Sequence, residues 1–242
     1  MNTPSASIWL QRTPAPDAAG RVFCIPQAGC GTSVFGRWPE RLRGIEFLPV
    51  ELPGRLSRFG QPMPPTFQAL AEVMLTGLRP YLDVPFAFFG HCWSAIAAYE
   101  ATALAERGGR AVTRLFVSSD LPPHEPRTNA MSTMTEGELG VEVAKMIRVL
   151  GKEPHPDLMA IYVKILRDDM AVRSRYVAPE PLRLATPITA FGWTDDEEIR
   201  PDQMNNWADC GEVKLEILPG DHNGFSAAPP EMLDTICFGM KA

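Results

Sequence analysis

The chain has 242 residues, 45% of them hydrophobic and 21% charged, so it can bury a large single core. Its formal net charge of −6 leaves no polybasic surface that would attract nucleic acid or an anionic membrane. The apolar runs fall far short of the ~20 residues that a membrane span needs. We therefore expect neither a nucleic-acid partner nor a membrane partner.

Residues 1–20 are rich in Pro, Ala and Thr and lack the apolar stretch of a secretory signal, so we expect a loosely held lead-in. The cysteines are scattered without a C-x-x-C pair, which argues against a zinc site or a disulfide framework. A reducing, cytoplasmic location is the plain inference. The five are Cys24, Cys30, Cys92, Cys210 and Cys237.

Short apolar runs alternate with helical spacing along the first half of the chain. This alternation predicts an α/β fold with a parallel sheet and right-handed crossovers. The predicted strands are residues 21–26, 45–52, 85–89 and 114–119, and the predicted helices are residues 67–78 and 95 to about 108. After an interruption, strands are predicted at 187–193 and 213–218, and a last helix at 230–240.

The interruption, residues 121–185, is predicted to be a helical lid inserted into a single domain of residues 1–242, with helices at 134–150 and 156–175. It holds close to half of the methionines of the chain. Flexible methionines suit a surface that must fit varied apolar chains, but most of these are better explained as helix core residues. They are Met131, Met134, Met146, Met159 and Met170.

Cys92 lies where the apolar run 85–89 stops at a glycine and gives way to alanine-rich sequence. A strand, a sharp turn and a closely packed helix are typical of the G-x-S-x-G nucleophile elbow. Here Cys92 replaces the serine and Ser94 replaces the second glycine. The five letters alone fit equally well with Cys92 as one more buried cysteine.

The strand at 21–26 leads into the Gly-rich stretch 27–32. In a hydrolase with this chain order, the loop after that strand gives one backbone N–H to an oxyanion hole, and the residue after the nucleophile gives the other. The donors would be the amides of Ala28 and Trp93. The alternatives are a plain turn or a phosphate-binding loop, although the Gly-Lys-Ser/Thr ending of a P-loop is absent.

A nucleophile, an acid and a histidine after successive strands is the order of an α/β-hydrolase triad. Cys92, Asp196 and His222 supply that order. Asp195 is the alternative acid. Asp196 is preferred because a hydrophobic residue, Ile199, lies three positions beyond it, where such hydrolases usually have a hydrophobic residue after the acid. His91 adjoins the nucleophile, but its side chain would leave the turn in another direction.

With these residues the chain resembles the stand-alone type II thioesterases of nonribosomal-peptide and polyketide assembly lines, a branch of the α/β hydrolases. The resemblance runs from about Arg21 to the C-terminal helix. It is carried by segments similar to F-x-x-P-H-A-G (23–29), L-P-G-R (52–55), G-H-S-x-G-A (90–95) with Y-E (99–100), V-S-x-x-x-P (117–124), L-R-x-D (166–169) and G-x-H (220–222). The departures are Gln27 for His, Cys92 for Ser and Ser94 for Gly.

The resemblance implies an α/β-hydrolase fold and release of acyl or aminoacyl groups from the phosphopantetheine arm of carrier proteins. It implies no cofactor or metal of the enzyme itself, and a monomer. Arg55 and Arg58 are candidates for steering acidic carrier proteins, with solvated loop charge as the alternative.

Cysteine leaves three functions open. The first is a thioesterase that works through a Cys-bound acyl-enzyme. The second is a transferase or cyclising enzyme that passes the group to another thiol or an amine, because exchange between thioesters is close to thermoneutral. The third is a carrier-protein binding module without catalysis.

Overall fold

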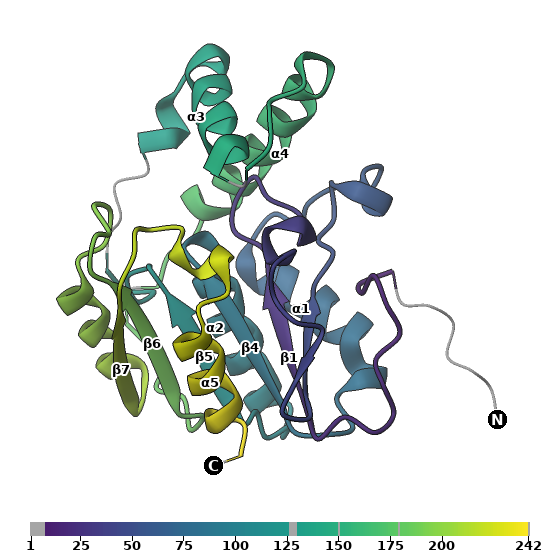
Figure 1. Ribbon diagram of the computed structural model, residues 1–242, viewed down its shortest axis with the longest axis vertical. Coiled ribbons are helices and arrows are strands. Elements are labelled where there is room, and N and C mark those ends of the chain that lie inside the picture. The colour runs from purple at the N-terminus through teal and green to yellow at the C-terminus, as the bar shows by residue number, and fades with distance from the viewer. Residues whose placement is uncertain (1–7, 126–129, 150, 179, 242) are drawn as a thin grey trace.

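The computed structural model describes residues 8–125, 130–149, 151–178 and 180–241. One seven-stranded sheet runs through it in the order β2-β3-β1-β4-β5-β6-β7 (Figure 1). The strands are β1 (Gly20–Ile25), β2 (Arg41–Leu42), β3 (Ile45–Pro49), β4 (Phe86–His91), β5 (Arg114–Ser118), β6 (Ile188–Trp193) and β7 (Val213–Leu218). All neighbours pair in parallel except β2, a short antiparallel edge strand.

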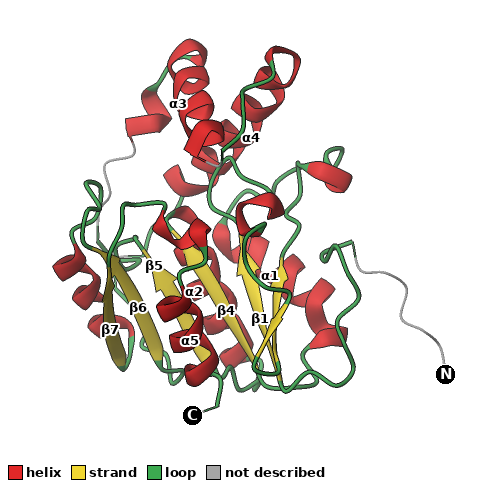
Figure 2. Ribbon diagram, in the orientation of Figure 1, coloured by secondary structure: helices red, strands yellow, loops and turns green. Residues whose placement is uncertain are grey.

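Helices cover both faces of the sheet, so the predicted mostly parallel sheet flanked by helices is confirmed (Figure 2). The helices are α1 (Phe67–Leu78), α2 (Trp93–Arg107), α3 (Glu136–Val149), α4 (Pro156–Ser174) and α5 (Pro230–Gly239). The helix predicted at residues 67–78 and the strand predicted at 213–218 have the observed bounds, and the other predicted elements differ by a few residues at their ends. Leu150, the last residue of one predicted helix, lies outside the described residues.

The core forms one layer on each face of the sheet. Strands β1 and β4 are buried on both faces, which is why they read as continuous apolar runs. Side chains of α1 and α2 pack on one face, and side chains of α5 pack on the other. Two buried layers hold the strands rigidly, so the loops at their carboxyl ends have fixed starting points.

The segment between β5 and β6 stands apart at one end of the molecule (Figure 1). We call residues 119–187 the insertion; it carries α3 and α4, which pack against each other. The five methionines named above are partly buried against the two core layers, which fits their interpretation as core residues.

The expectation of a loosely held lead-in is wrong for residues 8–20, while residues 1–7 lie outside the described chain. Trp9 and Leu10 are buried, and the guanidinium of Arg58 lies 3.7 Å from the ring centroid of Trp9. Arg12 donates to Glu46 at 2.7 Å. A buried aromatic ring and an ion pair tie this segment to the sheet and to the loop after β3.

A ten-residue 3-10 helix after β6, Pro201–Cys210, was not predicted from the sequence. It buries Met204 and Trp207 against the sheet. Among the described residues, no helix combines the length and apolar character needed to cross a membrane.

Candidate active site

Cys92 occupies the turn between β4 and α2. Its backbone is in a left-handed conformation, with φ 51° and ψ −125°, which is strained for a residue with a Cβ. The turn is possible because residue 90 is glycine: a Cβ there would lie 2.2 Å from the carbonyl oxygen of Ser94. Strand and helix thus meet closely enough to lift Cys92 out of the sheet.

Ser94 does more than supply a small side chain at this crossing. Its hydroxyl lies 2.8 Å from the carbonyl oxygen of Ile25 and 2.9 Å from that of His91, and it accepts from the His91 amide at 2.9 Å. The hydroxyl therefore links the end of β1 to the elbow. A glycine would have no such link.

His222 lies in the turn after β7, with its ring directed at an acid after β6. Its Nδ1 is 3.1 Å from Oδ2 of Asp196, whose side chain is fully buried. Asp196 also accepts the backbone N–H groups of Glu198 and Ile199 at 2.9 and 3.0 Å. Asp195 is exposed, so the structure places Asp196, not Asp195, against the imidazole.

The imidazole also hydrogen-bonds Cys92. Burial lowers the pKa of His222, but the hydrogen bonds to Asp196 and Cys92 outweigh burial and raise this pKa to about 11. Glu198, with its carboxylate 3.9 Å from Nε2, acts in the same direction. The interaction is mutual, so the imidazolium favours the thiolate of Cys92, the form that acts as a nucleophile.

Asp196, the acid of this pair, is also kept in its ionised form. Burial raises the pKa of Asp196, yet the hydrogen bond and the charge of His222 outweigh it and lower the pKa below its usual range. An ionised Asp196 fixes the proton on Nδ1 of His222, which leaves Nε2 on the side of the thiol. The arrangement can therefore activate a thiol and exchange a proton with a leaving group.

The two amides expected to bind an oxyanion come from the start of α2 and from the loop after β1. Trp93 is the first residue of α2, and the first amides of a helix have no acceptor within the helix. Ala28 lies in a turn closed by the Cys30 amide, which donates to the Gln27 carbonyl at 3.1 Å. The Ala28 amide takes no part in the hydrogen bond that closes this turn.

Gln27 and His91 flank the catalytic candidates without replacing them. Nε2 of Gln27 donates to Oδ1 of Asn223 at 3.4 Å, so Gln27 links the loop after β1 to the turn that carries His222. The His91 ring stacks on Phe225 at 4.0 Å, and its Nδ1 lies 3.0 Å from Oγ of Ser118. These contacts direct His91 away from the role of base.

Cys92 differs from the other cysteines in exposure: it is partly exposed and the other four are buried. Burial raises the pKa of the Cys30 thiol to about 11 and that of the Cys210 thiol to about 12, and it also raises the pKa values of Cys24 and Cys237. These four are inert thiols at neutral pH.

The interpretation of Arg55 and Arg58 as carrier-docking charges is wrong, and so is the alternative of solvated loop charge. Arg55 is 2% exposed and Arg58 is 5% exposed. Arg55 pairs at 2.6 Å with Asp169 of α4, a residue that the sequence analysis noted only as part of a motif. Only the fold brings these two positions, 114 residues apart, together.

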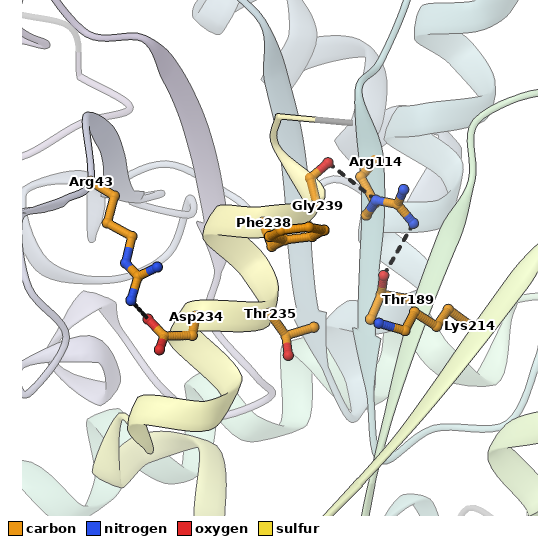
Figure 3. Close-up of a pocket in the computed structure, with 8 residues that line it drawn as sticks. All are labelled: Arg43, Arg114, Thr189, Lys214, Asp234, Thr235, Phe238 and Gly239. Carbon is orange, nitrogen blue, oxygen red and sulfur yellow. Dashed lines mark hydrogen bonds and ion pairs between the residues drawn. The ribbon is translucent and has the colours of Figure 1, made fainter.

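A pocket on the α5 face of the sheet is lined by none of the candidate site residues, and its lining is drawn in Figure 3. It is lined by Arg114 and Lys214, at the amino-terminal starts of their strands, whereas Cys92 and His222 follow carboxyl ends. The cationic side chains of this pocket already have partners within the protein: Arg43 pairs with Asp234, Lys214 pairs with Glu216, and Arg114 donates to the Gly239 carbonyl. It has no part in the chemistry of Cys92.

No group of three or more His, Cys, Asp or Glu side chains is placed to hold a metal ion within the part of the chain that the structure describes. The fold and the constellation around Cys92 define an α/β hydrolase. Residues 20–237 match the family model described as thioesterase domain, and the chain belongs to this family.

Relatives support the family assignment along most of the chain. The gramicidin S biosynthesis protein GrsT of Aneurinibacillus migulanus is 27% identical over 226 residues, covering 90% of this chain and 87% of that protein. The medium-chain S-acyl fatty acid synthase thioesterase of Rattus norvegicus is 28% identical over 219 residues, covering 86% and 82%.

Solved structures agree with the fold. The type II thioesterase BorB from the borrelidin biosynthetic cluster has a TM-score of 0.85 at 24% identity, covering 99% of this chain and 100% of its own. RedJ, a thioesterase from the prodiginine biosynthetic pathway in Streptomyces coelicolor, has a TM-score of 0.73 at 28% identity, covering 98% and 94%. The predicted α/β-hydrolase fold is confirmed.

Proposed function

We propose that the protein is a type II thioesterase that releases acyl or aminoacyl groups from the phosphopantetheine arm of carrier proteins in nonribosomal-peptide or polyketide biosynthesis. The observation that carries the proposal is Cys92 on a strained elbow, hydrogen-bonded to a histidine that is paired with buried Asp196. Relatives from gramicidin S and prodiginine biosynthesis support the choice of pathway class. The carrier domain is the partner, and the insertion serves as the lid.

In the first half of the reaction the Cys92 thiolate attacks the thioester carbonyl carbon. A new C–S bond forms to Cys92, the bond to the phosphopantetheine sulfur breaks, and the imidazolium of His222 gives its proton to that departing thiolate. The amides of Ala28 and Trp93 hold the oxyanion of the tetrahedral intermediate. A donor of this kind contributes ~3 kcal/mol in hydrolases.

In the second half, water attacks the acyl-Cys92 carbonyl. His222, now neutral, takes a proton from the water, the bond to the Cys92 sulfur breaks, and the free acid leaves. The thiolate–imidazolium pair is restored. Asp196 keeps the imidazole in one orientation through both halves.

The nucleophile also favours a second candidate function, acyl transfer. A serine enzyme would convert a thioester into an oxygen ester and lose the thioester's extra free energy. Cys92 keeps it, so the acyl-enzyme can pass its group to another thiol or to an amine. Hydrolysis remains the proposal because the family match runs along the whole fold.

One experiment tests the proposal and separates the candidates. The protein is incubated with an acylated carrier protein, and free acid is measured with and without an unloaded carrier protein bearing its phosphopantetheine thiol. We expect release of acid at the same rate in both cases, and none with Cys92→Ala. Acyl groups that appear on the added carrier instead of in solution would identify a transferase.

A further inference from the structure

Asp169 is fully buried in α4 and contacts both segments that carry the expected oxyanion donors, the loop after β1 and the first residue of α2. Its carboxylate Oδ2 accepts the Gly29 amide at 2.8 Å, in the loop that holds Ala28. Its backbone carbonyl accepts the indole N–H of Trp93 at 2.8 Å. One residue of the insertion thereby touches both sides of the hole.

Arg55 completes this attachment from the loop after β3. Its Nη2 lies 2.6 Å from Oδ1 of Asp169, and its Nη1 donates to the Cys30 carbonyl at 2.6 Å. The ion pair thus holds the loop of residues 27–31 at two successive residues, Gly29 by its N–H and Cys30 by its C=O. Both partners are buried, so the pair is little screened by solvent.

These contacts determine where the Ala28 amide points. A peptide unit is planar and trans, so the Ala28 N–H points opposite to the Gln27 carbonyl. That carbonyl is held by the Cys30 amide, and the next peptide is held by the bond from Gly29 to Asp169. Turning either peptide would break a bond to a buried group.

Gly29 makes the close approach of the insertion possible. Its φ of 72° is in the left-handed region, and a Cβ there would lie 3.3 Å from Cδ1 of Leu166 and 3.4 Å from Cε of Met146. Side chains of both α3 and α4 therefore rest on the loop. The insertion therefore supports the loop that carries Ala28.

We propose that Asp169 is a positioning residue, through which helix α4 holds the 27–31 loop and Trp93 in the shape that stabilises the oxyanion. The proposal rests on the proposed function of the Cys92 site. It separates two properties of that site: the thiolate depends on His222 and Asp196, and the oxyanion hole depends on Asp169 and Arg55.

The test compares Asp169→Asn with wild type and with Asp168→Asn, a neighbouring acid that pairs with Lys164 on the surface. Alkylation of Cys92 by iodoacetamide needs the thiolate but forms no oxyanion. Acylation by p-nitrophenyl butyrate, which is monitored through the p-nitrophenolate that it releases, needs both the thiolate and the oxyanion hole. We expect Asp169→Asn to keep the alkylation rate within ~2-fold and to lower kcat for the ester ~100-fold with little change in KM; Asp168→Asn should match wild type in every assay.

A folded Asp169→Asn protein with wild-type ester kinetics would overturn the proposal, and so would equal losses in alkylation and acylation, since those indicate a general structural role. If Asp169→Asn does not fold, Arg55→Lys, which keeps the cation but loses the forked contact, undergoes the same two assays with the same criteria. Neither assay uses a carrier protein. A wild type that fails on acyl-carrier protein yet shows this split would refute the proposed substrate and leave the role of Asp169 standing.

Discussion

Nδ1 of His222 lies 3.1 Å from the buried carboxylate of Asp196, while the same ring hydrogen-bonds Cys92. The imidazole therefore stands between an anion that fixes it and a thiol that it can ionise. Because the pKa of His222 is raised to about 11, the imidazolium persists at pH values where a free imidazole has lost its proton.

The first prediction concerns the pH dependence of Cys92 reactivity. With the pair intact, the alkylation rate should stay nearly level from about pH 7 to pH 9, since His222 keeps its proton up to about 11. His222→Ala should give a rate that rises with pH around ~8.5, the value of an ordinary thiol. The pH dependence of the alkylation rate of Asp196→Asn should lie between those of wild type and His222→Ala.

Asp195→Asn is the matched control, because Asp195 is exposed one residue away. Its alkylation profile should overlay that of wild type. A wild-type profile centred near 8.5 would show that Cys92 is not paired with His222.

The second prediction is selective labelling. Iodoacetamide at neutral pH should modify Cys92 ahead of the other cysteines, because those four are buried with raised pKa values. Peptide mapping after brief exposure identifies the site. Labelling of Cys210 or Cys237 in equal yield would contradict the burial on which the prediction depends.

The third prediction concerns the elbow. Gly90→Ala should destabilise the protein by about 3 kcal/mol or more, because the new Cβ meets backbone atoms of Ser94, which cannot move aside as the end of a flexible side chain could. Gly60→Ala is the control, since a Cβ there meets nothing within 4 Å. Urea unfolding midpoints measure both; similar midpoints for the two variants would disprove the close crossing.

The fourth prediction concerns the segment before β1. Arg58→Ala removes the cation from the Trp9 ring and the hydrogen bond to the Glu51 carbonyl. It should lower the free energy of unfolding by about 2 kcal/mol. Exposed Arg110, replaced by alanine, should leave the unfolding midpoint nearly unchanged, and an equal loss in both variants would contradict the packing of Arg58.

The elbow and the order of its partners could be predicted from sequence because they depend on local signals. Gly90 and Ser94 mark a close crossing, and His222 follows the last strand in a turn. The helix at 67–78 was predictable for the same reason: its spacing is regular and Thr66 caps it, accepting from the Ala69 amide.

The burial of Arg55 and Arg58 could not be predicted, since their partners are distant in the chain. Arg55 needs Asp169 of α4, and Arg58 needs the Trp9 ring. A loop rich in arginine looks like solvated charge until those partners are placed. The 3-10 helix at Pro201–Cys210 was missed because it is polar overall. Its buried residues Met204, Trp207 and Cys210 recur every three residues, the period of a 3-10 helix.

The most direct test of the account is the mass of the intact protein after rapid mixing with an acylated carrier protein, followed by an acid quench. We predict an added mass equal to the acyl group, located by peptide mapping on Cys92, removed by hydroxylamine and absent from Cys92→Ala. His222→Ala should acylate far more slowly. Acyl release at the wild-type rate by Cys92→Ala, or an acyl group found on another residue, would contradict the central claim that Cys92 is the nucleophile.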